Sequence, residues 1–165
     1  MLLTALVLAD THLRADGRRW LPASLLEQLG RADLVLHAGD VVGAGVLERI
    51  GAETPGSVHA VLGNNDLSLD LPETLELDLA GVVVGMIHDS GPAAGREQRM
   101  RRRFPDCQVV VFGHSHIPVD EVGADGQLLF NPGSPTQRRR QPVGTFGVLQ
   151  LSGGRVVGHR IVPVE

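Results

Sequence analysis

The chain of 165 residues has the length of one domain with one substantial core, and its 42% of hydrophobic residues excludes global disorder. Its formal net charge of −4 does not favour bulk, sequence-independent binding of nucleic acid. The one cysteine, Cys107, excludes an intramolecular disulfide and suits a reducing compartment, so we expect a cytoplasmic protein.

The first half of the sequence alternates apolar strands with helical patterns. Residues 2–9 form an apolar run that is typical of a strand buried on both faces and too short for a membrane span, so we expect no membrane partner. Residues 34–38 and 58–62 repeat this pattern. Helices are predicted between the strands at residues 22–30 and 46–50. This order predicts a parallel sheet, whose functional groups gather at the carboxyl ends of its strands.

The second half is richer in strands. Residues 74–79 and 82–87 predict a hairpin around Ala80-Gly81, and an arginine-rich helix is predicted at residues 92–104. Further strands, mostly antiparallel, are predicted at residues 108–112, 119–122, 127–130, 144–151 and 156–162. We therefore expect an α/β fold of two packed mixed β-sheets flanked by helices, with no domain boundary within residues 1–165.

Motifs that are rich in metal ligands follow the predicted strands. They are Asp10-Thr11-His12, Gly39-Asp40, Gly63-Asn64-Asn65-Asp66, His88 and Gly113-His114-Ser115-His116. Residues i and i+2 of an extended segment project to the same side, so Asp10 and His12 can bind one ion together. The carboxylate of Asp40 can bridge two ions. Each motif alone is a weak signal, but their occurrence in this order, each after a strand, indicates a metal site.

Together with Asn131-Pro132-Gly133-Ser134, these motifs resemble those of the calcineurin-like metallophosphoesterase superfamily. The chain length and the Gly-Asn-Asn-Asp variant resemble its small single-domain phosphodiesterase branch. The resemblance covers about residues 1–150 and implies a four-layer α/β/β/α sandwich with a binuclear metal centre. It implies that the first metal is bound by Asp10, His12 and His116, the second by Asn64, His88 and His114, and both by Asp40, with Asp40, Asn64 and His114 as the catalytic residues.

The resemblance further implies hydrolysis of a phosphate ester by attack of a metal-bridging hydroxide on phosphorus. Manganese is the first candidate for the two divalent ions, with iron, zinc, nickel, cobalt or magnesium as alternatives. Related phosphomonoesterases carry a histidine, thought to protonate the leaving group, directly after the metal-binding asparagine. Here that position is Asn65, which cannot act as an acid. We therefore expect a preference for phosphodiesters, and a small phosphodiester as the substrate.

Residues outside the ligand set have supporting roles in this hypothesis. Asp66 is expected to orient a ligand, and Asn131 to shape a loop under the metal site. Candidate substrate contacts are Asn65, Arg138 and Arg139. The two arginines are included because guanidinium groups bind phosphate with two hydrogen bonds.

Two other groups have predominantly structural interpretations. The arginines at positions 99, 102 and 103 share one helical face, which predicts a solvated surface. His37, within a strand, is expected to be a buried, hydrogen-bonded histidine.

Two alternatives to a phosphodiesterase stay open. One is a non-catalytic, protein-binding scaffold of the same fold, as in the eukaryotic retromer subunit, whose metal site is degraded. The competent residues at all seven ligand positions argue against it. The other is a phosphomonoesterase, which Asn65 disfavours. A homo-oligomer is a further open alternative, since small members of this family often self-associate.

Overall fold

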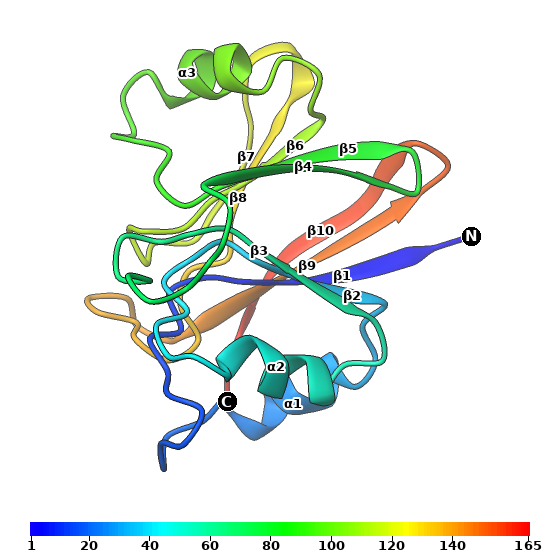
Figure 1. Cartoon of the computed structure of the whole chain (residues 1–165). Coiled ribbons are helices and arrows are strands. Elements are labelled where there is room, and N and C mark those ends of the chain that lie inside the picture. Colours follow the sequence, from blue (N-terminus) through cyan, green and yellow to red (C-terminus); the bar gives the residue numbers. More distant parts are fainter.

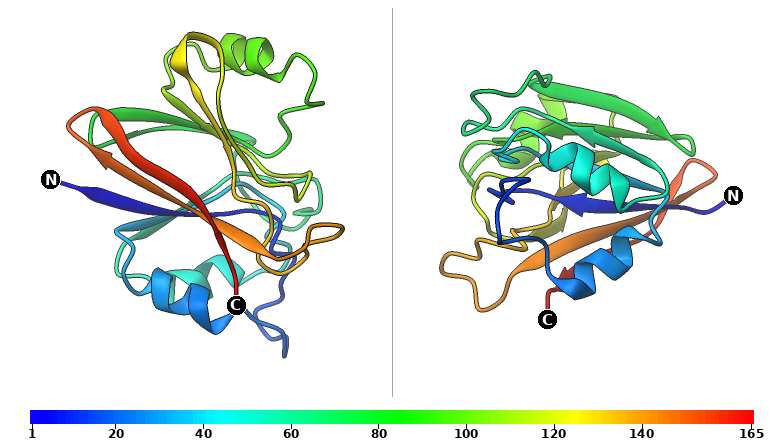
Figure 2. Two further views of the ribbon diagram at one scale, coloured as in Figure 1. Left: turned by 180° about the vertical axis from the view of Figure 1, so that it is seen from behind. Right: turned by 60° about the horizontal axis from the view of Figure 1, so that its bottom comes forward.

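A computed structural model describes all residues of the chain, Met1–Glu165. Ten strands form two five-stranded β-sheets, which pack face to face with helices on the outside (Figure 1). Helices α1 (Ala23–Leu29) and α2 (Val46–Ala52) cover the first sheet, and α3 (Arg96–Arg103) covers the second, as the further views also show (Figure 2). The predicted fold class, two mixed sheets flanked by helices, is confirmed. No helix has both the length and the apolar character that a membrane crossing requires.

The first sheet has the strand order β10-β9-β1-β2-β3. Its members are β1 (Leu3–Leu8), β2 (Leu34–His37), β3 (Ser57–Ala60), β9 (Thr145–Ser152) and β10 (Arg155–Pro163). Strands β1, β2 and β3 are parallel, which confirms the alternating pattern of the first half, and β9 and β10 add an antiparallel edge. The three parallel strands therefore end at one edge of the sheet.

The second sheet has the order β4-β5-β6-β8-β7. Its members are β4 (Thr74–Leu79), β5 (Val82–Ile87), β6 (Val109–Val111), β7 (Val119–Val122) and β8 (Leu128–Asn131), with a 3₁₀ turn, η1 (Ala124–Gly126), between β7 and β8. The β4–β5 hairpin turns at Ala80 and Gly81, whose φ angles of 54° and 83° suit a tight type I′ turn. Strand β8 is parallel to β6, so this part of the chain is less antiparallel than predicted.

The core lies in three layers. Seventeen buried residues, among them Val7 and Val84, fill the space between the two sheets. Thirteen more pack α1 and α2 against the first sheet, and six lie beneath α3. Because both faces of each central strand are covered, these strands are continuously apolar, and polar side chains appear only where the strands end.

Helix α3 differs from its predicted limits. Helix α3 begins at Arg96 rather than at residue 92, because Gly91 and Gly95 adopt positive φ angles of 77° and 72° that end any helical run. The Arg99 side chain is not solvated as predicted: it is half-buried and donates hydrogen bonds to the carbonyls of Ser90 (2.7 Å) and Pro92 (2.5 Å). The loop that precedes α3 is therefore fixed by the helix itself.

Candidate metal centre

The loops after β1, β2, β3, β5 and β6 converge at one end of the two sheets, on the left in Figure 1. Glycines allow this approach. A Cβ atom on Gly63 would lie 2.1 Å from the backbone nitrogen of Asp40, and one on Gly113 would lie 2.8 Å from the Cβ of Ala9. The glycines before Asn64 and His114 are thus required for the close contact between neighbouring loops.

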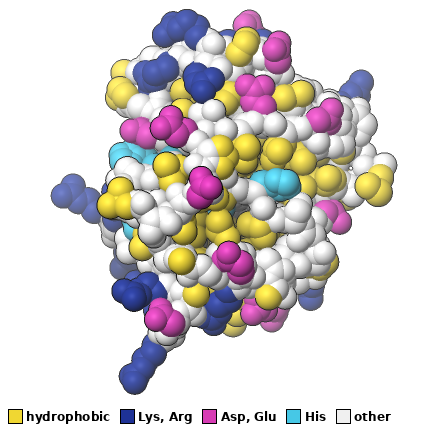
Figure 3. Space-filling model, viewed as in Figure 1, with side chains coloured by type: hydrophobic (Ala, Val, Ile, Leu, Met, Phe, Trp, Pro, Cys, Tyr) yellow, Lys and Arg dark blue, Asp and Glu magenta, His cyan; other side chains and the backbone are white.

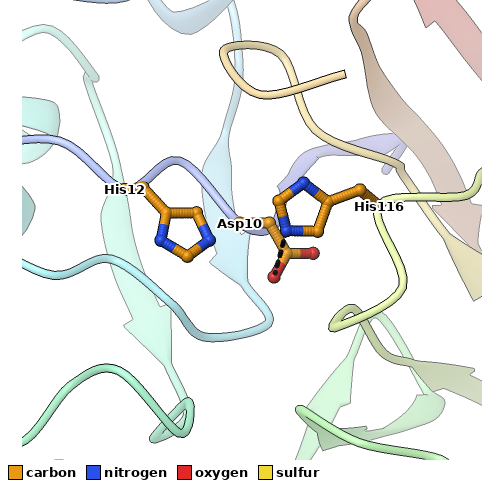
Figure 4. A group of neighbouring side chains, drawn as sticks. All are labelled: Asp10, His12 and His116. Carbon is orange, nitrogen blue, oxygen red and sulfur yellow. Dashed lines mark ion pairs between the residues drawn. The ribbon is translucent and has the colours of Figure 1, made fainter. Parts of the chain in front are cut away.

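The first group of candidate ligands consists of Asp10, His12 and His116. One ligand atom from each lies within 4.8 Å of the others. His116 Nε2 is 3.6 Å from Asp10 Oδ1, and the centroids of the two imidazole rings are 5.3 Å apart. Both rings lie beside the Asp10 carboxylate (Figure 4). Asp10 and His116 are buried, and the His12 side chain is 14% exposed. The three residues follow strands of two different sheets.

The second group surrounds His88, which forms a similar cluster with Asp10 and Asp40. His88 Nε2 is 3.5 Å from Asp40 Oδ2 and 3.9 Å from Asp10 Oδ1. Asn64 Oδ1 lies 3.1 Å from His88 Nε2 and 3.1 Å from His114 Nδ1. The structure thus brings all seven predicted ligand residues together, with Asp10 and Asp40 between the two groups of imidazoles.

Backbone carbonyls fix the orientation of two imidazoles. The Nδ1–H of His88 donates to the carbonyl of Ala38 (2.7 Å), and the Nδ1–H of His116 donates to that of Gln137 (2.6 Å). In each neutral ring, Nε2 therefore carries a lone pair directed at the cluster, which is the arrangement of metal-binding histidines. Sequence reasoning missed both carbonyls, because a backbone acceptor has no residue-type signal.

Buried polar atoms without partners provide a direct test of whether metal ions fit. Asp10 Oδ1 and Oδ2, His12 Nε2 and His116 Nε2 are buried and have no hydrogen-bond partner. Each such atom costs about 1–3 kcal/mol unless something compensates it. All of these atoms are electron-pair donors and face one another, so a divalent cation satisfies them together. The mixed nitrogen and oxygen donors suit a first-row transition metal.

The pKa values in the metal-free site diverge. Burial raises the pKa of Asp10 to about 7, although the charge of His88 opposes this shift. Burial also acts to raise the pKa of Asp40, but hydrogen bonds from the protonated form of His88 and from Asn65 outweigh it and hold that pKa below its usual range. Burial lowers the pKa of His12 and of His116, so both rings are neutral ligands at pH 7. Such divergence is typical of functional sites.

Asp66 ties two of the ligand-bearing loops together. Its Oδ2 accepts hydrogen bonds from the backbone N–H groups of Asp40 and Gly63 (both 2.8 Å), and its Oδ1 accepts one from Val42 (2.7 Å). The carboxylate is therefore fully occupied by backbone donors. It orients the loops that carry Asp40 and Asn64, and it is not directed at the cluster itself.

Asn131 supports the histidine loop after β6. Its Nδ2 donates to the carbonyl of Gly113 (3.0 Å), and its Oδ1 accepts a hydrogen bond from Gly133 (2.9 Å). His37 is buried as predicted: it accepts a hydrogen bond from the N–H of Gly39 (3.2 Å), and burial lowers its pKa to about 3. These two side chains therefore hold the backbone of the loops around the cluster by hydrogen bonds.

The three candidate substrate contacts lie at different places. Asn65 donates from its backbone N–H to Asp40 Oδ1 (2.9 Å) and from Nδ2 to Asp40 Oδ2 (2.8 Å), so it contacts the central carboxylate. Arg138 and Arg139 are exposed and line a hollow beside His116. Histidine and arginine side chains are visible together at the left edge of the surface (Figure 3).

Known proteins are similar to this chain in sequence and in fold. Residues 3–154 match the calcineurin-like phosphoesterase superfamily domain. A probable metallophosphoesterase of Methanocaldococcus jannaschii is 32% identical over 162 residues, which cover 96% of this chain and 80% of that protein. Vacuolar protein sorting 29 from Cryptosporidium parvum is similar in structure, with a TM-score of 0.79, 21% identity and 98% of both chains covered. A novel archaeal phosphodiesterase has a TM-score of 0.71 and 18% identity, covering 98% of this chain and 100% of that one.

Proposed function

The chain belongs to the calcineurin-like phosphoesterase superfamily, and from this membership we propose that it is a phosphodiesterase that works with two divalent metal ions. The observation that carries the proposal is the set of buried, partnerless donor atoms on Asp10, His12 and His116, beside a second group around His88. Manganese is the first candidate metal, and the cytoplasm is the proposed location.

The residues of the chain would divide the work as follows. Asp10, His12 and His116 would hold one ion, Asn64, His88 and His114 the other, and Asp40 both. When bound, the ions would make a water molecule more acidic and neutralise charge on the phosphoryl oxygens.

Two features of the chain would assist. The low pKa of Asp40 keeps it ionised as a ligand, and the hydrogen bonds from Asn65 hold its two oxygens in place. The His114 side chain is 46% exposed, so a substrate can reach it from solvent.

The preference for diesters rests on Asn65. Its amide cannot deliver a proton to a poor leaving group, and its Nδ2 is engaged by Asp40. Diesters with a leaving group that needs little protonation should therefore react faster than monoesters. The similarity in fold to an archaeal phosphodiesterase agrees with this preference.

The test is hydrolysis of bis(p-nitrophenyl) phosphate beside p-nitrophenyl phosphate, with Mn²⁺ and with chelator. We expect metal-dependent turnover that favours the diester. Asp40→Ala should lower it by more than the ~100-fold that loss of an outer hydrogen-bonding partner costs. Asp16→Ala, at an exposed position, is the matched control and should behave as wild type.

A protein-binding scaffold is the second candidate, because the fold is similar to that of vacuolar protein sorting 29. It makes the opposite prediction. Protein that retains Mn²⁺ by elemental analysis yet turns over neither ester would favour the scaffold. Faster hydrolysis of the monoester would instead favour a phosphomonoesterase.

A further inference from the structure

The loop Ser134–Gln141 is attached to both loops of the first ligand group. Ser134 Oγ donates to the carbonyl of Asp10 (2.8 Å), and Thr136 Oγ1 donates to that of Thr11 (2.6 Å). The carbonyl of Gln137 accepts the hydrogen bond from His116 described above. Three arginines follow directly, so their backbone position is fixed relative to the metal ligands.

These arginines lie on a tight turn. The N–H of Gln141 donates to the carbonyl of Arg138 (2.9 Å), and Arg138 Nη1 donates back to the carbonyl of Gln141 (2.5 Å). Arg139 has a φ of 52°, which turns the chain between its two neighbours. The arginine ion pairs of the protein are Arg14–Asp16 and Arg101–Asp125, so the guanidinium groups at positions 138–140 have no carboxylate partner.

The turn lines a hollow of about 270 Å³ beside the cluster. Its walls are Ser115, His116, Ile117, Arg138, Arg139, Arg140 and Gln141. His116 is the only metal-ligand candidate among them, and no carboxylate lines the hollow.

A second hollow, of about 400 Å³, lies beside the other ligand group. It includes Asn64, His88 and His114, and its other ionisable residues are Glu73, Asp89 and Arg103. The two carboxylates disfavour an anion there, whereas the arginine hollow attracts one. A larger hollow of about 440 Å³ is lined by none of the candidate ligand residues. The two sides of the cluster thus differ in charge.

We propose that the arginine hollow binds a second phosphate of the substrate. This inference rests on the proposed phosphodiesterase function and names its substrate class: a diester with a further phosphate on one substituent and an uncharged polar group on the other. The scissile phosphate lies at the cluster, where the metal ligands are. The unpaired guanidinium groups beside it therefore have a separate anion to bind, by the two-pronged hydrogen bonding that arginine gives to phosphate.

The test compares the dinucleotide thymidylyl-thymidine with its 5′-phosphorylated and 3′-phosphorylated forms, at constant ionic strength. Affinity for the Mn²⁺-loaded protein is measured at low temperature by calorimetry, and kcat/KM by separation of the products. We expect one phosphorylated form to bind about 10-fold more tightly than the unphosphorylated one. Arg139→Gln should remove most of that advantage. Arg160→Gln, an exposed arginine on β10 with the same charge change, should keep it.

The outcomes separate the two proposals. Equal affinity for all three dinucleotides, or an equal loss in both variants, overturns the second-phosphate site, even if bis(p-nitrophenyl) phosphate is hydrolysed. An Arg139-dependent advantage in binding without any turnover supports the site and overturns the phosphodiesterase. Displacement of each dinucleotide alike by an acidic peptide, with no effect of the terminal phosphate, would assign the arginines to a protein partner instead.

Discussion

Asp10 carries a charge that the metal-free fold disfavours. Its carboxylate is fully buried, both oxygens lack a hydrogen-bond partner, and its pKa rises from 3.8 to about 7. Between these pH values the folded protein binds a proton that the unfolded chain does not. Stability therefore falls as the pH rises from about 4 to 7, by up to about 4 kcal/mol from this group.

In the presence of a chelator, Asp10→Asn should make the metal-free protein more stable at pH 8, because the neutral amide replaces a buried carboxylate charge. We expect a gain of about 2–4 kcal/mol in the free energy of unfolding at pH 8 and none below pH 4, measured by urea denaturation. Asp16→Asn, at an exposed position, should change neither value. A variant less stable than wild type at pH 8 would show that another group already compensates the Asp10 charge.

The same carboxyl should make metal affinity depend on pH. Below pH 7 a proton must leave Asp10 before an ion binds, whereas His12 and His116 are already neutral. Burial acts to lower the pKa of His88, but hydrogen bonds to Asp40 and to the carbonyl of Ala38 outweigh it and raise that pKa, so His88 supplies a second proton. We expect the affinity for Mn²⁺ to weaken by at least about tenfold for each pH unit below about 7, with release of one proton or more. Calorimetric titration at pH 6, 7 and 8, in two buffers of different ionisation enthalpy, measures both. A constant affinity from pH 6 to 8 would contradict the raised pKa.

At the scale of elements, the loops after β2 and β3 depend on Asp66, which accepts three backbone hydrogen bonds from them. Asp66→Ala leaves buried N–H groups without partners. We expect a loss of about 3 kcal/mol in stability and a 10- to 100-fold loss of Mn²⁺ affinity. Urea denaturation and metal titration check these values. Asp70→Ala, a nearby exposed carboxylate, is the control, and equal effects of both variants would rule out the positioning role.

The strands could be predicted from the sequence, because strands covered on both faces are continuously apolar and their ends are marked by polar motifs. The motifs that carry the candidate ligands follow from that marking, whereas their assignment to two ions is what the family resemblance implies. The start of α3 could not be predicted, because Arg99 fixes the preceding loop through carbonyls that the sequence pattern does not reveal. The carbonyls of Ala38 and Gln137, which orient two imidazoles, were missed for the same reason.

At the scale of the whole molecule, the candidate metal centre joins the two sheets. Asp10, Asp40 and Asn64 follow strands of the first sheet, and His88 and His116 follow strands of the second. The apolar interface between the sheets is complete without metal, since its seventeen buried residues include none of the candidate ligands. The fold should therefore persist in the presence of a chelator. The loops that carry the candidate ligands would then lack the metal ions that link the two sheets.

Metal ions should consequently stabilise the whole fold. An ion that binds only the folded state at 1,000 times its Kd adds about 4 kcal/mol, which for a chain of this size raises Tm by roughly 10 °C. Calorimetric scans with increasing Mn²⁺, and with chelator, measure the shift. Asp40→Ala should strongly reduce this rise in Tm, because the carboxylate proposed to bind both ions is lost. Asp16→Ala should show the same rise as wild type. A full shift in Asp40→Ala would mean that Mn²⁺ binds elsewhere, and a single melting transition throughout would show that both sheets unfold together.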